Sequence, residues 1–314
     1  MLRMTVRREN SVSLTSIITV NFHQAEVTID LLKSVAKSYS SSEVEVIIVD
    51  NGASENNEAV FHLYFENITY IQSRENLGFA GGNNLGIKQA KGDYVFLLNN
   101  DTEIPEGCIE TLISELEANE KIGLLSPLLL YFDQKDLIQY AGFTPMNYLV
   151  ARNAYIGQFE KNEGQYHKSY ETSFCHGAAV ICRKADLDRA GLMDETYFLY
   201  YEELDWCEKF KRIGKQIWFT GKTYMYHKES ISVGKASPLK IYFNTRNRML
   251  FIRKNTGWLN TILFAVYFSV IACPKAVLKF LLNKQPALAK CTIKGLLWNY
   301  THRKNSKDLG YKIK

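Results

Sequence analysis

The sequence predicts an α/β protein with a doubly wound, mostly parallel sheet and a C-terminal helical extension that associates with a membrane. β-Branched apolar runs alternate with helical patterns over the first hundred residues, which is typical of parallel strands joined by helices. The last 40 residues hold ten Lys or Arg and one acid, Asp308. Because the whole chain carries +5, this +9 stretch leaves −4 on residues 1–274.

Length and composition limit the class of protein. The 314 residues are 46% hydrophobic and 23% charged, which excludes collagen-like, coiled-coil and disordered chains. The six cysteines show no Cys-x-x-Cys spacing and are expected to be free thiols in a reducing compartment. The first residues contain no apolar stretch of signal-peptide length, so we do not expect export through a signal peptide.

The first half of the chain predicts a strand–helix alternation. The apolar periodicity indicates strands at 14–22, 44–49, 68–72 and 94–98, helices at 25–38 and 85–90, and a glycine-rich loop at 76–84. In a parallel sheet, ligands bind at the carboxyl ends of the strands. The polar clusters that follow these strands are therefore expected at one ligand-binding edge.

The second half is less regular. The pattern predicts a helix at 106–118, an apolar segment at 123–132, a strand at 173–183, a short helix at 184–191 and an amphipathic helix from Glu203 that ends at Gly214. Residues 133–172 show weak periodicity and give no clear pattern of strands or helices. We expect one catalytic domain over 1–254, with halves at about 14–102 and 103–254, and an extension over 255–314.

Two polar segments of the first half are candidate ligand contacts. Asn99, Asn100 and Asp101 directly follow an apolar strand, where oxygen ligands can hold Mg2+ or Mn2+; a helix-capping turn is the alternative. Gly78 and Gly81 belong to a run that allows close approach of a diphosphate, or forms a plain turn. Its spacing and its position after a later strand disfavour a dinucleotide site.

An ordered set of motifs resembles glycosyltransferase family 2. The segments are SIITVNF, IIVDNGAS, NLGFAGGNNLGI, GDYVFLLNNDT, CHGAAVICRKADLDRAGLMDETYFLYYEELDWCEKFKRIG, MYHKES and NTRNRMLFIRK, over residues 14–255. The resemblance is strongest to the rhamnosyltransferase-like branch. It implies the GT-A fold and transfer of a sugar from a nucleoside-diphosphate donor.

The resemblance also implies roles for individual residues. Donor contacts would be Thr19, Val20, Asn21, Asp50, Asn76, Gly78, Gly81, Asn99, Asn100, His176, Gly177 and Ala178. Asp50 would bind the pyrimidine edge, and Asp101 with His227 would hold the divalent metal. Asn99 departs from the Asp-x-Asp motif of the family because it offers a neutral amide. Lys228, Arg246 and Arg248 are candidate phosphate contacts, and for Arg246 and Arg248 an exposed charge on a helix is the alternative.

A second acidic group, Glu202, Glu203 and Asp205, precedes the amphipathic helix. A sugar hydroxyl is a poor nucleophile, so a carboxylate must accept its proton during attack on the anomeric carbon. The resemblance implies that Glu203 is this base, with Asp205 as the fallback, and that the anomeric centre inverts. An acidic helix N-terminus without catalytic function is the alternative.

The implied partners follow from the family. The donor would be linked to dTDP (rhamnose) or UDP (a hexose), and the acceptor would be a glycan or a polyprenyl-diphosphate-linked sugar in cell-envelope polysaccharide synthesis. Nucleic acid is not expected, because the basic tail lacks a recognisable binding motif. Two other classes stay open: a sugar nucleotidyltransferase, and a non-catalytic, membrane-attached sugar-binding or scaffold subunit.

The extension is the most apolar part of the chain. Residues 255–274 carry no charge and are borderline for spanning a bilayer. Lys275, Lys279, Lys290 and Lys294 then alternate with apolar residues, as in helices that lie on an anionic leaflet. We therefore expect a peripheral anchor at the cytoplasmic face of the plasma membrane; core helices or an oligomer interface are the alternatives.

Overall fold

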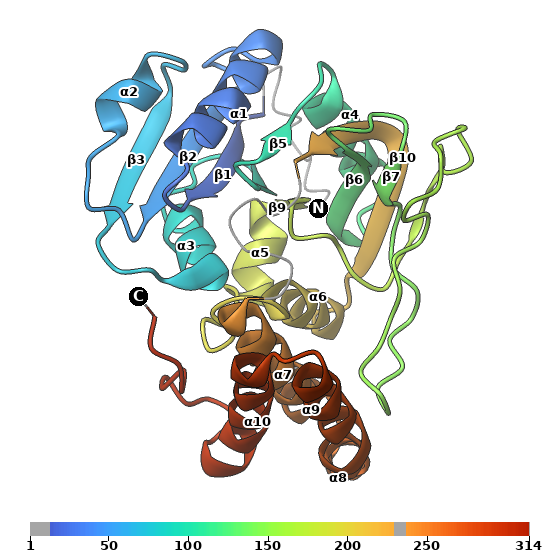
Figure 1. Ribbon diagram of the computed structural model, residues 1–314. Helices are drawn as coiled ribbons and strands as arrows, with labels where there is room; N and C mark the ends of the chain where they lie inside the picture. Colours follow the sequence, from blue (N-terminus) through green and yellow to red (C-terminus); the bar gives the residue numbers. More distant parts are fainter. Residues whose placement is uncertain (1–12, 229–236, 314) are drawn as a thin grey trace, which may run out of the picture.

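A computed structural model describes residues 13–228 and 237–313. Its centre is a ten-stranded sheet with the order β3-β2-β1-β4-β9-β6-β10-β5, while β7 pairs with β6 and β8 with β10 (Figure 1). The pairs β3–β2, β2–β1, β1–β4 and β6–β10 are parallel, and β9 is antiparallel to both β4 and β6. The predicted mostly parallel α/β sheet is confirmed.

The first half follows the expected alternation. Its elements are β1 (Thr15–Asn21), α1 (Ala25–Ser38), β2 (Val44–Asn51), α2 (Glu58–His62), β3 (Ile68–Ser73), α3 (Gly78–Ile87) and β4 (Tyr94–Leu98). All eight residues of β2 and all five of β4 are buried, because helices cover both faces of a parallel sheet. This burial explains why their sequences are continuous apolar runs.

Helix α3 corrects the prediction of a glycine-rich loop at 76–84. The helix begins at Gly78, seven residues before the expected start. A Cβ atom on Gly82 would lie 2.9 Å from Val20 Cγ1 in β1, so the glycine lets the helix pack directly on the sheet. Among the glycines of α3, only Gly78 has a positive φ, +69°. Glycine adopts this angle without strain, so the chain can turn into the helix at its first residue.

The second half completes the sheet and adds the helices beside it. Its elements are β5 (Thr102–Glu103), α4 (Cys108–Ala118), β6 (Ile122–Tyr131), β7 (Ile138–Tyr140), β8 (Ser169–Glu171), β9 (Ala179–Arg183), α5 (Lys184–Ala190), α6 (Glu202–Arg212) and β10 (Gln216–His227). The strand predicted at 173–183 begins only at Ala179, since β9 pairs with β4 from Leu98–Ala179 to Tyr94–Arg183. Residues 173–178 instead form the non-strand segment that precedes β9.

The C-terminal part is helical, as predicted. It contains α7 (Pro238–Asn255), α8 (Trp258–Tyr267), the π-helical turn η1 (Phe268–Ala272), α9 (Cys273–Leu282) and α10 (Pro286–Thr301). Gly295 of α10 lies against the α7 backbone, where a Cβ would be 2.8 Å from Tyr242 O. Asn299 Nδ2 also donates to Arg246 O at 3.0 Å. The extension is therefore packed onto the helix that follows the sheet.

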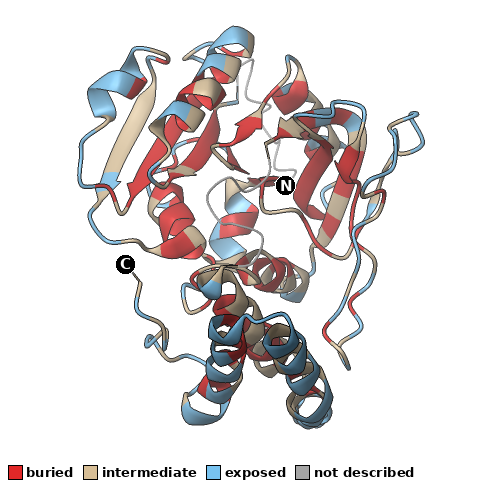
Figure 2. Ribbon diagram, in the orientation of Figure 1, coloured by how far each residue is buried: buried red, intermediate tan, exposed pale blue. Residues whose placement is uncertain are grey.

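The outer surface of these helices is apolar. The helical stretch Trp258–Leu282, 25 residues with mean hydropathy 1.9, is long and apolar enough to cross a membrane. Figure 2 shows that α8, α9 and α10 are exposed over much of their length. The large exposed apolar side chains here are Trp258, Leu259, Ile262, Leu263, Val266, Val270, Ile271, Leu278, Leu281, Leu282, Ile293, Leu297 and Tyr300.

Candidate active site

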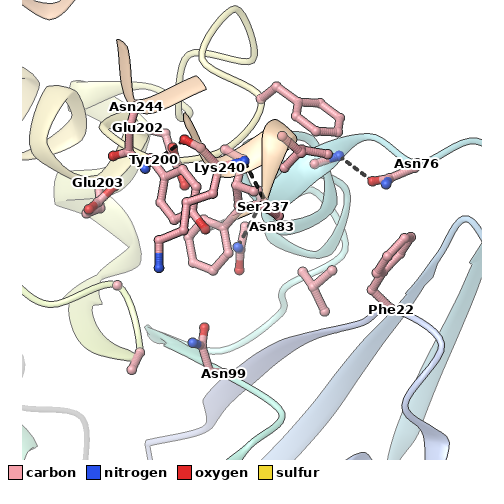
Figure 3. A pocket seen from close by; sticks show the side chains of 18 of the residues that line it. Phe22, Asn76, Asn83, Asn99, Tyr200, Glu202, Glu203, Ser237, Lys240 and Asn244 are labelled. Atoms are coloured by element: carbon pink, nitrogen blue, oxygen red, sulfur yellow. Dashed lines mark hydrogen bonds between the residues drawn. The ribbon is translucent and has the colours of Figure 1, made fainter. Parts of the chain in front are cut away.

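A cavity of about 1080 Å³ opens at the carboxyl-end edge of the sheet. One wall comes from the ends of β1, β2 and β4, and the opposite wall comes from α6, α7, α10 and the C-terminal residues. In Figure 3, Glu202, Glu203, Tyr200 and Lys240 lie on one side, across from Asn99. The site is therefore built from both halves of the chain.

The predicted donor residues divide into two groups. Val20, Asn76, Gly78, Asn99, Asn100, His176, Gly177 and Ala178 line the cavity, whereas Thr19, Asn21, Asp50 and Gly81 are not among its lining residues. Gly81 lies inside α3, where its Cβ would meet Leu77. The backbone N–H of Asn99 donates to Ala178 O at 2.9 Å, so the end of β4 fixes the 176–178 segment.

Asp50 lies beneath the cavity wall and is 1% exposed. Its Oδ1 accepts a hydrogen bond from Asn21 Nδ2 at 2.9 Å, and its Oδ2 accepts from Asn57 Nδ2 and from the Tyr70 hydroxyl, both at 2.8 Å. These three donors hold the carboxylate in place, as buried charges require. In the structure Asp50 therefore organises the ends of β1, β2 and β3.

Asn51, next in the chain, faces the cavity and was missed by the sequence analysis. Its Oδ1 accepts from the Leu77 N–H at 2.8 Å, and its Nδ2 donates to Asn76 Oδ1 and to Gly78 O, both at 3.2 Å. Asn76 Oδ1 also accepts from the Gly78 N–H at 3.0 Å. The side chain of Asn51 thus shapes the entry to α3.

Asp101 and His227 come from distant parts of the chain and meet at the cavity. Antiparallel pairing of Thr102 with His227 brings them together, and His227 Nε2 lies 3.1 Å from Asp101 Oδ1. Burial raises the pKa of Asp101, but the contact with His227 outweighs burial and holds that pKa below its ordinary value. Asp101 is therefore a carboxylate at neutral pH.

The surroundings of His227 suit a metal ligand. Gln139 Oε1 lies 2.8 Å from His227 Nδ1, so Nδ1–H is the donor and Nε2 faces the Asp101 carboxylate. Asp101 Oδ1 and His227 Nε2 are both buried and have no other hydrogen-bond partner among the described residues, so these two atoms can share a proton or bind one metal ion together. Adjacent ligands of an octahedral ion with bonds of about 2.1 Å lie about 3.0 Å apart, close to the observed spacing. The pair offers one ring nitrogen and one carboxylate oxygen, and no group of three or more His, Cys, Asp or Glu side chains suited to a metal is found within residues 13–228 and 237–313, so a Mg2+ or Mn2+ ion bound here would need further ligands from water or a diphosphate.

His176 completes this part of the cavity as a neutral ring. Its centroid lies 5.8 Å from that of His227. Burial, with the charge of His227, lowers the pKa of His176 to about 3. The Ala178 N–H donates to His176 Nδ1 at 3.1 Å, so the neutral ring carries its proton on Nε2. His176 is thus a hydrogen-bond donor at the sheet edge.

Glu202 and Glu203 both line the cavity at the start of α6. Burial raises the pKa of Glu203 to about 6, and burial together with the charge of Glu203 raises the pKa of Glu202 well above its ordinary value. Oε2 of each is buried without a hydrogen-bond partner among the described residues. A carboxylate with a pKa near 6 is suited to accept a proton at neutral pH.

A strained turn delivers these two carboxylates. Phe198, Tyr200 and Tyr201 have φ values of 63°, 68° and 75°, each costing about 1–3 kcal/mol for a residue with a side chain. Asn247 of α7 holds the turn, because its Nδ2 donates to the carbonyls of Tyr197, Leu199 and Tyr200 at 2.7–2.9 Å. Packing against α7 therefore sets the position of Glu202 and Glu203.

Asp205, the second candidate base, points elsewhere. It is 2% exposed and is not among the residues that line the cavity. Its Oδ1 accepts from the Tyr197 hydroxyl at 3.1 Å and from Asn255 Nδ2 at 2.8 Å. Asp205 thus links α6 to the end of α7.

The three cations considered for phosphate binding lie outside the cavity lining. Lys228 pairs with Asp30 at 2.9 Å. Arg246 is fully buried, with its guanidinium 4.5 Å from the centre of the Trp298 ring, and Arg248 is 9% exposed and donates to Val150 O. Neither the phosphate role nor the exposed-charge alternative fits these two arginines, which instead join α7 to its neighbours.

Comparison with known proteins identifies the family. A family model described as glycosyl transferase family 2 matches residues 16–191, which is more than half of the chain. The chain belongs to glycosyltransferase family 2.

Two relatives of this family 2 glycosyltransferase align with more of the chain than residues 16–191. The low-salt glycan biosynthesis hexosyltransferase Agl10 of Haloferax volcanii is 26% identical over 240 residues, 75% of this chain and 74% of the relative. The N-acetylglucosaminyl-diphospho-decaprenol L-rhamnosyltransferase of Mycobacterium tuberculosis is 21% identical over 241 residues, 68% of this chain and 76% of the relative. Both alignments are longer than the region that the family model matches.

Solved structures show the same fold. A mannosyltransferase from Pyrobaculum calidifontis, in complex with GDP-Man and Mn2+, matches with a TM-score of 0.55 and 11% identity over 91% of this chain and 87% of the other. The S. aureus TarS 1-349 structure matches with a TM-score of 0.56 and 16% identity over 90% and 80% of the two chains. The family 2 glycosyltransferase described here has the GT-A-type α/β fold.

Proposed function

We propose that this family 2 glycosyltransferase is an inverting, metal-dependent enzyme that moves a hexose or rhamnose from a nucleoside diphosphate to a hydroxyl group of a lipid-linked glycan. One observation carries the proposal. A carboxylate with a pKa of about 6, Glu203, lines the same cavity as the Asp101–His227 pair. A proton acceptor and a site for the leaving diphosphate are thus available to one bound donor.

The proposed reaction is a single displacement. Glu203 accepts the proton of the acceptor hydroxyl while the hydroxyl oxygen forms a bond to the anomeric carbon. The bond from that carbon to the diphosphate oxygen breaks on the opposite face, and its electron pair leaves with the nucleoside diphosphate. Asp101 and His227 would hold the divalent ion, which when bound stabilises the negative charge on the leaving diphosphate. His176 Nε2–H is placed to donate to the sugar or the diphosphate.

The donor and acceptor classes are inferred from two relatives. The names of these relatives include a hexosyltransferase and a rhamnosyltransferase acting on a decaprenyl-diphosphate-linked sugar. From these names we infer a UDP-hexose or dTDP-rhamnose donor and a polyprenyl-diphosphate-linked acceptor; the cavity volume of about 1080 Å³ is at the upper end of the range of ligand pockets. The apolar helices α8–α10 support a location at the inner face of the plasma membrane, where such acceptors are held.

The test is a panel of nucleotide sugars with Mg2+, with Mn2+ and with a chelator. We expect one donor to be consumed only when a divalent ion is present. Glu203→Gln should bind that donor with kcat lower by about 10²–10⁴-fold, because it cannot accept the proton. Asp205→Asn is the matched control and should retain turnover.

Three outcomes would contradict parts of this proposal. If a donor binds but stays intact for wild type with every metal and acceptor lipid, the chain is a non-catalytic binding subunit. If diphosphate is released from a nucleoside triphosphate, the chain is a nucleotidyltransferase. If Asp205→Asn is inactive while Glu203→Gln turns over, the assignment of the base is wrong.

A further inference from the structure

The cavity has a basic wall to which the reaction above gives no role. Lys240 of α7, Lys290 and Lys294 of α10, and Lys312 of the C-terminal segment all line the same cavity as Glu203. Lys240 lies over the Tyr200 ring at 5.9 Å, and in Figure 3 it is on the same side of the cavity as Glu202 and Glu203. These four cations thus belong to the same wall of the cavity as Glu202 and Glu203.

These lysines are available for an external anion. Within residues 13–228 and 237–313, no carboxylate pairs with Lys290, Lys294 or Lys312. Lys290 and Lys294 are four residues apart on α10 and therefore project from the same face of the helix. An ammonium group binds phosphate as a point charge, so two unpaired lysines on one face of a helix can both contact a phosphate or diphosphate.

Apolar surface lies beside the same lysines. Leu239, Tyr311 and Ile313 line the cavity with them. On α10 the exposed Ile293 and Leu297 follow Lys290 and Lys294 by three residues each, and α8 and α9 also carry exposed apolar side chains. A ligand held here by its anionic head can extend an apolar chain along α8–α10.

We infer that Lys290, Lys294, Lys240 and Lys312 bind the diphosphate of a prenyl-diphosphate-linked acceptor and direct its sugar toward Glu203, with the prenyl chain lying on the apolar face of α8–α10. This inference rests on the proposed function and adds the residues of the acceptor subsite. The donor diphosphate is a less suitable occupant, because Asp101 and His227 lie at the sheet edge and the lysines lie on the helical wall.

The test uses farnesyl diphosphate as the probe and the full chain in detergent, with a chelator present so that no metal holds diphosphate in the donor half. We expect Lys290→Gln/Lys294→Gln to bind farnesyl diphosphate at least about tenfold more weakly than wild type, because two charge-assisted contacts are lost. Farnesyl diphosphate should bind wild type at least about tenfold more tightly than inorganic diphosphate, since burial of the chain adds affinity.

The matched control is Lys275→Gln/Lys279→Gln. It removes the same charge at the same four-residue spacing on α9, from lysines that are exposed and are not among the cavity lining residues. We expect this pair to bind farnesyl diphosphate within about twofold of wild type. Thermal unfolding of both double variants should match wild type, because all four side chains are solvent-accessible.

Failure of the inference is distinguishable from failure of the proposed function. If both double variants lose the same affinity for farnesyl diphosphate, the lysines act only through the overall positive charge of the extension. That result would overturn the subsite. Equal affinity for inorganic and farnesyl diphosphate would overturn the role of the apolar face. Donor turnover in the nucleotide-sugar panel, measured on the same preparations, reports on the function alone.

Discussion

Burial raises the pKa of the Glu203 carboxyl group toward physiological pH. The folded pKa of about 6 lies above the ordinary value, so the carboxyl is protonated below this pH and becomes a base above it. We expect kcat to rise with pH through about 6 and then to level off. A pH–rate profile of the wild type checks this; a rate that stays constant down to pH 5 would contradict the role of Glu203.

At His227, a neighbouring residue sets which ring nitrogen faces Asp101. Gln139 is 4% exposed and accepts from Nδ1 of His227, so Gln139→Leu should free the ring to adopt the other tautomer. Loss of such a supporting partner typically weakens metal binding about 10–100-fold. The apparent Mn2+ affinity, measured from the metal dependence of the rate at saturating donor, is the readout.

Two results would separate this role from a general loss of structure. Excess Mn2+ should restore the rate of Gln139→Leu, whereas a misfolded variant would stay inactive at every metal concentration. Gln139→Glu keeps an oxygen acceptor for Nδ1–H and should keep the Mn2+ affinity of wild type. Equal metal affinity in Gln139→Leu and wild type would contradict the positioning role.

At the scale of elements, α7 determines where α6 begins. Asn247 Nδ2 donates to three carbonyls of the turn before Glu202, and Asn247→Asp replaces this donor with an oxygen that repels them. We expect kcat to fall at least tenfold while the donor KM changes by less than about threefold, since the variant moves the base and leaves the donor wall intact.

Asn299→Asp is the control for Asn247→Asp. Asn299 is also buried and its Nδ2 donates to carbonyls of Arg246 and Gly295, so both variants should lose stability, by about 1–3 kcal/mol for an unsatisfied buried group. Asn299 does not contact the turn, and its variant should keep kcat. If both variants lose kcat equally, Asn247 has a structural role and no specific effect on Glu203.

Over the whole molecule, α8, α9 and α10 lie at the end opposite strands β1–β3 (Figure 1), and these helices carry most of the large exposed apolar side chains. Ile262 and Val270 are 52% and 68% exposed on the helical end, and Leu63 is 80% exposed after α2. Replacing Ile262 and Val270 by Asp should lower binding to anionic vesicles more than tenfold, because each apolar side chain contributes about 1.5–3 kcal/mol on burial.

Leu63→Asp is the matched control for membrane binding. It adds a charge to an exposed apolar position beside β3, so it should float with vesicles as wild type does. Flotation of the full chain with vesicles that contain anionic lipid is the measurement. Unchanged binding by Ile262→Asp/Val270→Asp would contradict the membrane contact of α8–α10 and would favour an interface between proteins.

The strands and most helices could be predicted because their signals are local. Residues 44–49 and 94–98 are apolar runs because they are buried on both faces, and this periodicity is visible in the sequence. The glycines of α3 led to the prediction of a loop, since glycine lowers helix propensity. They occur there because Gly82 packs against Val20, a contact between segments that no local pattern reveals.

The α/β alternation, the family motifs and the basic, apolar tail could all be predicted from the sequence, because each depends on residues that are neighbours in the chain. Which polar residues share a site became apparent from the packing of the elements. Pairing of β5 with β10 joins Asp101 to His227, the Asn247 contact positions Glu203, and packing of α10 on α7 brings Lys290 to the same cavity. Such contacts join residues far apart in the chain, so their geometry follows from how the sheet and helices pack and not from spacing along the sequence.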